Sequence, residues 1–235
     1  MSFKGIALVT GAAQGIGRGV ALRFADDGYT VAVNDLGSNS EKLDSLVDEI
    51  QNKGRASSKY IADVSLEGEV KDMVDQVVRD HGGLDVMVAN AGIGGPIRLP
   101  FIETSAEQWD RVMSVNARGP FLCYKYAGLQ MIKQGRGGRI IGASSFSGKQ
   151  GVPTKAAYSA SRFAVRGLTQ VAAQEFGAHG ITVNAYAPGL IDTPMGTLAA
   201  QDDWDVASLV SFLASAESQF ITGQTISING GIFFD

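Results

Sequence analysis

The chain has 235 residues, of which 45% are hydrophobic and 19% charged, and its formal net charge is -4. This composition predicts one folded globular domain and excludes a disordered chain. A mildly acidic chain has no overall attraction to nucleic acid or to anionic membranes, so neither is expected as a partner. No apolar run reaches the roughly 18 residues that a membrane span needs. The single cysteine, Cys123, excludes an intrachain disulfide. Together with the absence of a signal-peptide pattern, it favours a cytoplasmic location.

Short apolar runs alternate with longer amphipathic runs along the whole chain. In chain order, strands are predicted over residues 6–10, 30–34, 55–62, 84–89, 138–143, 181–185 and 225–228. Helices are predicted over 16–27, 40–53, 66–81, 104–134, 154–178 and 206–215, with Gly119-Pro120 bending or interrupting the fourth. This alternation predicts a single Rossmann-like α/β domain over residues 1–235, a doubly wound parallel sheet of about seven strands with helices on both faces.

The first predicted strand is followed by a glycine-rich turn, Thr10-Gly11-Ala12-Ala13-Gln14-Gly15-Ile16-Gly17. In doubly wound sheets, ligands bind beyond the carboxyl ends of the strands. Glycines in such a turn let backbone approach a pyrophosphate, and the following helix N-terminus presents unpaired N–H groups to the phosphates. The strand, turn and helix context therefore predicts a dinucleotide site that includes Gly11, Gln14, Gly15, Ile16 and Gly17.

The second predicted strand ends at Asn34-Asp35, and Asp35 lies 18 residues after Gly17. A carboxylate at this place accepts hydrogen bonds from the ribose hydroxyls of adenosine and repels a 2′-phosphate. Its neighbours Asn34, Leu36 and Gly37 are uncharged. These residues predict NAD(H) rather than NADP(H) as the cofactor.

Further motifs follow in order along the chain. They are Asn-Ala-Gly at 90–92, Tyr158 in a Tyr-x-x-x-basic pattern, Pro188-Gly189 followed by Thr193, and Asn229-Gly230-Gly231. Together with the glycine turn they resemble the short-chain dehydrogenase/reductases with small, single-domain subunits, and the resemblance covers essentially the whole chain. It implies an oxidoreductase that uses a nicotinamide cofactor.

The resemblance also assigns roles to residues. The cofactor contacts that it implies, beyond the glycine turn, are Asp35, Leu36, Asp63, Val64, Asn90, Ala91, Gly92, Tyr158, Arg162, Pro188, Gly189, Ile191 and Thr193. The catalytic residues that it implies are Asn116, which would hold a water of a proton relay, Ser145, Tyr158 and Arg162. Ser145 lies 13 residues before Tyr158, the usual separation in the family, and its neighbour Ser144 is the alternative.

The implied chemistry is hydride transfer between the nicotinamide and a carbonyl carbon. The developing alkoxide needs a proton and electrostatic support. A tyrosine with an unperturbed pKa near 10 can exchange that proton when a nearby cation stabilises its phenolate. Tyr158 and residue 162 are four apart on a predicted helix, which places them on one face. Tyr158 would be the acid in reduction and the base in oxidation.

Two departures from the family pattern stand out. Arg162 occupies the position where the family almost always has lysine, and a guanidinium is planar and permanently charged. Three interpretations stay open: slower turnover, a fully working substitute, or a weak or inactive NAD(H)-binding protein that acts as a sensor or partner subunit. The second departure is a short substrate lid near 195–205. Either the lid is truly short, or lid residues are absent from the sequence, which we favour because lids are often disordered.

The stretches 163–170, 183–189 and 193–195 look like the diacetyl/acetoin reductase (butanediol dehydrogenase) branch. The predicted substrate is therefore a small ketone or diketone and its secondary alcohol, although other secondary alcohols or 3-oxoacyl carriers remain open. For 3-oxoacyl reduction we would expect NADP(H). In the family the helices equivalent to 104–134 and 154–178 pair subunits, which implies a homotetramer; the alternative is that these faces are ordinary core. His81 and His179 lack zinc-like partners, so no metal is expected.

Overall fold

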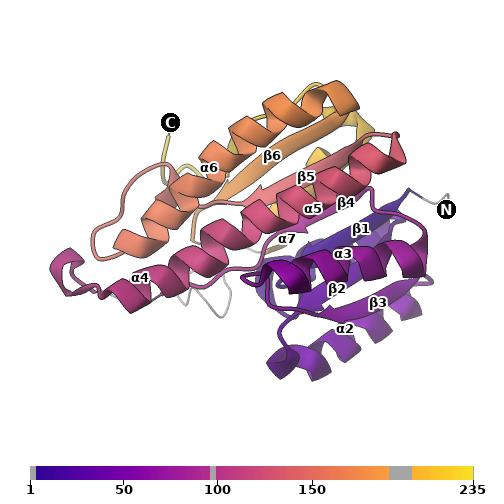
Figure 1. The fold of residues 1–235 in the computed structure, drawn as a ribbon, viewed down its shortest axis with the longest axis horizontal. Coiled ribbons are helices and arrows are strands. Elements are labelled where there is room, and N and C mark those ends of the chain that lie inside the picture. The colour runs from indigo at the N-terminus through magenta and orange to yellow at the C-terminus, as the bar shows by residue number, and fades with distance from the viewer. Residues whose placement is uncertain (1–3, 96–98, 191–202, 235) are drawn as a thin grey trace.

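The computed structural model describes residues 4–95, 99–190 and 203–234, which form a seven-stranded parallel sheet in the order β3-β2-β1-β4-β5-β6-β7 (Figure 1). The strands are β1 Ile6–Thr10, β2 Thr30–Asp35, β3 Ser57–Ile61, β4 Val86–Ala89, β5 Gly138–Ala143, β6 Ile181–Pro188 and β7 Thr225–Ile228. The helices are α1 Gly15–Asp27, α2 Ser40–Asn52, α3 Glu67–His81, α4 Ala106–Met113, α5 Gly119–Gln134, α6 Ala156–Phe176 and α7 Asp203–Ala214. The predicted doubly wound α/β fold is confirmed.

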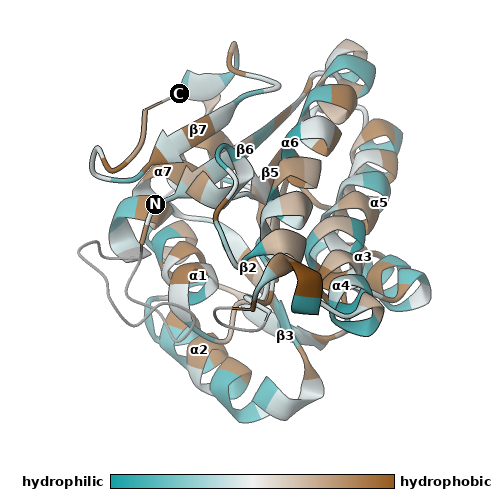
Figure 2. Ribbon diagram, turned by 90° about the vertical axis from the view of Figure 1, so that its left-hand side faces the viewer, coloured by the Kyte–Doolittle hydropathy of each residue, from teal (hydrophilic) through white to brown (hydrophobic). Residues whose placement is uncertain are grey.

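Helices cover both faces of the sheet, and strand β1 shows how (Figures 1 and 2). Ala7 and Val9 belong to the core that lies under α1, α2 and α7, whereas Ile6 and Leu8 belong to the core under α3, α5 and α6. Successive side chains of a strand point to opposite faces, so a strand covered on both faces has no polar position. This is why the strands appear in the sequence as continuous apolar runs.

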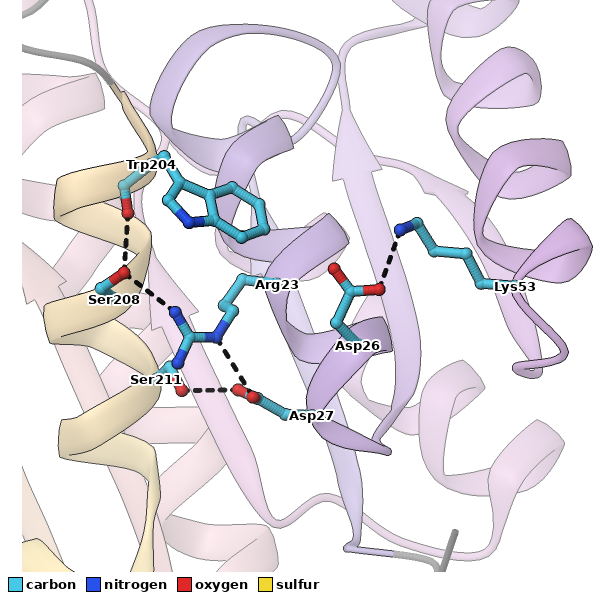
Figure 3. A network of polar contacts seen from close by, with 7 residues as sticks. All are labelled: Arg23, Asp26, Asp27, Lys53, Trp204, Ser208 and Ser211. Carbon is cyan, nitrogen blue, oxygen red and sulfur yellow. Dashed lines mark hydrogen bonds and ion pairs between the residues drawn. The ribbon is translucent and has the colours of Figure 1, made fainter.

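Helices α1 and α7 come from opposite ends of the chain and pack together through a polar network at their surface (Figure 3). Arg23 of α1 donates hydrogen bonds to Asp27 and, over 2.9 Å, to the hydroxyl of Ser208 on α7. Ser211 donates a hydrogen bond to the other oxygen of Asp27. The network thus joins the first third of the chain to the last.

The order of the strands reverses between β1 and β4, because the chain first winds outward through β2 and β3 and then returns. At such a switch point the loops that follow the two strands diverge to opposite faces and leave a crevice. The loops in question begin at Gly11 and Asn90. The fold therefore opens a crevice where the sequence predicts cofactor-binding residues.

The predicted interruption of the helix over 104–134 is present, but it lies directly before Gly119-Pro120 rather than at these two residues. Pro120 lies in the first turn of α5, where a missing N–H costs no hydrogen bond. The irregularity comes earlier, as a π-helical segment over Ser114–Arg118 between α4 and α5. Such π-bulges are frequent at functional sites, and this one contains Asn116.

Candidate active site

The glycine turn has the shape that its sequence predicts. Gly11 and Gly15 have φ values of +63° and +54°, in the left-handed region that favours glycine. Gly17 is required for another reason, because a Cβ there would lie 2.2 Å from the carbonyl oxygen of Gly11. Helix α1 begins at Gly15, so its N-terminal N–H groups face the crevice.

Asn90 braces this turn. Its Nδ2 donates hydrogen bonds to the carbonyl oxygens of Thr10, over 2.8 Å, and of Gly11, over 3.1 Å. The Tyr186 hydroxyl, fully buried on β6, donates in turn to Asn90 Oδ1 over 2.7 Å. Sequence reasoning missed Tyr186, because a tyrosine in an apolar strand usually only packs. Only the pairing of β6 beside β5 brings it next to Asn90.

Asp35 ends β2 at the other side of the glycine turn. Its carboxylate accepts hydrogen bonds from the Ala13 N–H over 3.1 Å, and from the Leu36 N–H and Asn39 Nδ2 over 2.8 Å each. It lines a cavity of about 140 Å³ that also includes Leu36, Asp63, Val64, Ala91 and Gly92. The structure thus gathers the residues predicted to hold adenosine.

Two cations come close to this end of the crevice from elements that sequence reasoning did not connect with it. Arg111 of α4 lines the same cavity as Asp35. The ammonium of Lys42, on α2, donates a hydrogen bond to Gln14 Oε1 over 2.8 Å. Neither residue adjoins Asp35 in the sequence, so no local signal could have found them.

The four predicted catalytic residues come from α6, the π-helical segment and the loop after β5. Tyr158 and Arg162 lie one turn apart on α6, Ser145 follows β5, and Asn116 lies in the π-helical segment. Burial raises the pKa of Tyr158, but the charge of Arg162, the hydrogen bonds with Ser145 and Arg162, and the charge of Lys155 together lower it below its usual value. The phenol is therefore prepared to give up and regain a proton.

Arg162 is held at two places. Its Nη1 donates to the Ala143 carbonyl oxygen over 2.8 Å, and its Cζ lies 5.1 Å from the ring centroid of Tyr158. The side chain is only 4% exposed, and its Nε has no hydrogen-bond partner. Gly92 makes room for it, because a Cβ there would lie 2.4 Å from Arg162 Nη2. The site thus contains a permanent cation with an unused donor.

The two adjacent serines point to different partners. The hydroxyl of Ser144 donates to the Arg162 carbonyl oxygen over 3.0 Å and is buried. Ser145 forms the hydrogen bond with the Tyr158 phenol, and its Oγ also accepts from the Ser147 N–H over 3.1 Å. This geometry supports the choice of Ser145 over Ser144 as the residue beside the reacting atoms.

Asn116 is fixed by three hydrogen bonds. Its Nδ2 donates to the Ile93 carbonyl oxygen over 2.8 Å and to Ser161 Oγ over 3.2 Å, and its Oδ1 accepts from the Ile93 N–H over 2.8 Å. Ser161 in turn donates to the Tyr158 carbonyl oxygen. Asn116 therefore connects the loop after β4 to the catalytic helix.

One cavity of about 150 Å³ brings the glycine turn together with Tyr158 and Arg162, whereas Ser145 and Asn116 are not part of its lining. Its lining comprises Gly11, Gln14, Gly15, Ile16, Gly17, Asn90, Ala91, Gly92, Ala143, Ser144, Tyr158, Arg162, Tyr186 and Pro188. Gly189 packs against Asn229, where a Cβ would meet its neighbour at 3.0 Å. Ile191 and Thr193 lie outside the described residues, as does most of the predicted lid. The glycines, the helix N-terminus and the unused Arg162 donor fit a dinucleotide that reaches from Asp35 to Tyr158.

Comparison with known proteins agrees with this geometry. The family model for short chain dehydrogenases matches residues 5–204. The chain belongs to this family. Its members are oxidoreductases with a nicotinamide cofactor, NAD or NADP, so the coarser prediction of family and cofactor class is confirmed.

Relatives differ in their reactions. A short-chain dehydrogenase/reductase of Armillaria gallica is 52% identical over 98% of this chain and 96% of its own. A 3-oxoacyl-(acyl-carrier-protein) reductase of Staphylococcus epidermidis is 42% identical over 97% and 98%. The acetoin dehydrogenase structure from Salmonella typhimurium superposes with a TM-score of 0.88 at 31% identity, over 96% and 94%. The family is shown, whereas the diacetyl/acetoin branch is not.

The alignment with the Armillaria protein spans 255 positions, more than the 235 residues of this chain, so that relative has residues with no counterpart here.

Among the described residues, no helix is long and apolar enough to cross a membrane. Within the same part of the chain, no three histidine, cysteine or acidic residues are grouped as a metal site. Burial raises the pKa of the Cys123 thiol to about 12, which leaves no thiolate near neutral pH.

Proposed function

We propose that the protein is an NAD(H)-dependent oxidoreductase that interconverts a small ketone or diketone and its secondary alcohol. The observation that supports this most directly is the Tyr158 phenol, held between Ser145 and Arg162 with a lowered pKa, in the cavity floored by the glycine turn. A protein that only binds a dinucleotide has no chemical need for this arrangement.

The residues divide the work. When bound, the nicotinamide supplies or accepts the hydride. The Ser145 hydroxyl donates a hydrogen bond to the substrate oxygen, and Tyr158 gives that oxygen a proton in reduction or removes it in oxidation. The guanidinium of Arg162 stabilises the phenolate and offers its free Nε to the cofactor. Asn116 holds the start of a path to water.

NAD(H) is the cofactor that the adenosine end favours. Three hydrogen-bond donors hold the carboxylate of Asp35 in place, and a carboxylate there would repel the 2′-phosphate of NADP(H). Lys42 and Arg111 lie nearby, and both would attract a phosphate. We infer that the fixed charge of Asp35 at the ribose decides the preference, because Lys42 is engaged with Gln14.

The test follows the loss of NADH absorbance with diacetyl and then with other small ketones. The unmodified protein and its Arg162→Lys variant are compared side by side. Turnover by the unmodified protein supports the proposal. If both proteins bind NADH but neither reduces any ketone, the alternative of a catalytically inactive NAD(H)-binding protein replaces it.

A second candidate is 3-oxoacyl reduction, which the Staphylococcus epidermidis relative favours. That reaction uses a long thioester substrate, and from the sequence we expect it to accompany NADP(H). The same assay separates the two by offering a 3-oxoacyl thioester with NADH and with NADPH. Strong preference for the thioester with NADPH would replace the small-ketone proposal.

We also propose that the protein is a homo-oligomer, a tetramer by family resemblance, and cytoplasmic. The described residues include a groove of about 310 Å³ between α5 and α6, lined by Phe121, Leu129, Leu168 and Val171 among others. Phe121, Leu129 and Val171 are all substantially exposed, and a second copy would cover them. Analytical ultracentrifugation of Leu129→Glu tests this proposal: the variant should have a lower mass in solution than the unmodified protein. The control is Ile61→Glu, which changes an exposed residue on the edge strand β3 and should leave the mass unchanged.

A further inference from the structure

Tyr158 lies between two hollows. It lines the large cavity described above and also a recess of about 20 Å³, and the two share no other described lining residue. The recess includes Gly94, Thr104, Gln108, Thr154 and Lys155. Most of the described cofactor residues line the first cavity or the neighbouring adenosine cavity, and of these only Tyr158 also lines the recess. The recess is therefore where a substrate can meet the phenol from another direction.

Lys155 gives this recess a positive charge. It precedes Tyr158 by three residues, is half-buried, and has no carboxylate within ion-pair distance among the described residues. None of the described residues that line the recess is acidic. The ammonium is close enough to the phenol for its charge to help lower the pKa of Tyr158. A half-buried cation without a counter-ion is a site that an anion can complete.

The backbone before Lys155 is strained. Thr154 has a φ of +66° and is the only non-glycine residue of positive φ in the described part of the chain. A β-branched residue rarely adopts this conformation, and such strain persists where the surrounding structure imposes it, often at ligand sites. Here it turns the chain into α6, which begins at Ala156, so that Lys155 comes to line the recess.

We propose that Lys155 binds the carboxylate of the substrate, so that the favoured substrates are short keto acids and the corresponding hydroxy acids. This inference rests on the proposed oxidoreductase function. A carboxylate, rather than a phosphate, suits so small a recess, and Thr104 and Gln108 offer further polar contacts beside it. Lys155 thereby orients the ketone while Tyr158 exchanges its proton.

The test compares each keto acid with its uncharged methyl ester. The probes are 2-oxobutanoate, 3-oxobutanoate and 4-oxopentanoate, with NADH as cofactor. The proteins are the unmodified chain, Lys155→Met, Lys155→Arg and the control Lys53→Met, which removes a surface ion pair with Asp26 and the same unit of charge. We expect the unmodified chain to prefer at least one acid over its ester. Lys155→Met should lower kcat/KM for that acid about tenfold or more, mainly through KM.

Lys155→Met should lower kcat/KM for the ester by a much smaller factor than for the acid, because only the effect through the pKa of Tyr158 is common to both. Lys155→Arg should keep most of the preference for the acid. Equal use of every acid and its ester by the unmodified chain would overturn the inference. So would an equal loss for acid and ester in Lys155→Met, since that indicates a role through Tyr158 alone. If no ketone is reduced, the proposed function is refuted. Calorimetric titration of the NADH-loaded protein with each acid and its ester then still tests whether Lys155 favours binding of the acid.

Discussion

The crevice joins two regions that are held in different ways. In the glycine turn, residues 10–17, backbone atoms form the site, and side chains such as Asn90 only brace them. In the proposed catalytic cluster, the atoms that would act are the ends of the side chains of Ser145, Tyr158 and Arg162, each placed by a different set of contacts. A backbone site depends on which residues have no side chain, whereas a side-chain site depends on packing from several elements.

Loss of the Tyr158 phenol should therefore stop the chemistry with little effect on cofactor binding, because the glycine turn and Arg162 stay in place. A change in the glycine turn should weaken cofactor binding first. The largest effect is expected for Tyr158→Phe. Removal of the phenol oxygen should lower kcat about 10³-fold, because general acid–base catalysis typically contributes 10²–10⁴-fold. Fluorescence titration with NADH should show an unchanged Kd. A tenfold weaker Kd would mean that the two regions are not separable.

Arg162→Met should have the next largest effect, a loss of about 100-fold in alcohol oxidation at neutral pH, because the phenolate that accepts the proton becomes scarcer. Without the guanidinium, the pKa of Tyr158 rises, because burial is no longer opposed by the cation. Ketone reduction needs the phenol and falls as pH rises through its pKa, while alcohol oxidation needs the phenolate and rises. Both limbs of the pH–rate profile should therefore move to higher pH in the variant. Limbs that stay in place would show that Arg162 acts on the cofactor alone.

Gly17→Ala tests the other region. The added Cβ would meet the Gly11 carbonyl oxygen at 2.2 Å and Asn90 Nδ2 at 2.5 Å. Overpacking of this kind costs about 1–3 kcal/mol, so the free energy of unfolding should fall and the Kd for NADH should rise about tenfold or more. Gly68→Ala is the matched control, because a Cβ there has no atom within 4 Å. Urea denaturation should show it unchanged or slightly more stable.

The smallest effect is expected for Asp35→Asn, which keeps the shape of the side chain and removes its charge. The ratio of kcat/KM for NADH to that for NADPH should fall about tenfold, because one repulsion of the 2′-phosphate is lost while Lys42 and Arg111 remain. An unchanged ratio would show that the two cations, and not Asp35, decide the preference.

The comparison of the two regions also explains what could be predicted. Strands buried on both faces give continuous apolar runs, so the fold can be predicted from local patterns. A glycine-rich turn between a strand and a helix is typical of a dinucleotide site, so Gly11, Gly15 and Gly17 can be predicted in the same way. The strand β6 extends to Pro188, beyond the predicted 181–185, because pairing with β7 continues there. Gly119-Pro120 signals an irregularity near Asn116, but nothing in the sequence predicts its π-helical form.

By itself, the sequence determined the order of strands and helices, the loop that receives a dinucleotide, and the spacing of Tyr158 and Arg162 on one helix face. These depend on interactions between near neighbours and on the periodicity of burial. Only the tertiary structure decided which residues meet across the crevice. Tyr186 reaches Asn90, Gly92 makes room for Arg162, and Lys155 faces a recess beside Tyr158. Such contacts join residues far apart in sequence or depend on the path of the whole chain, so no short pattern encodes them.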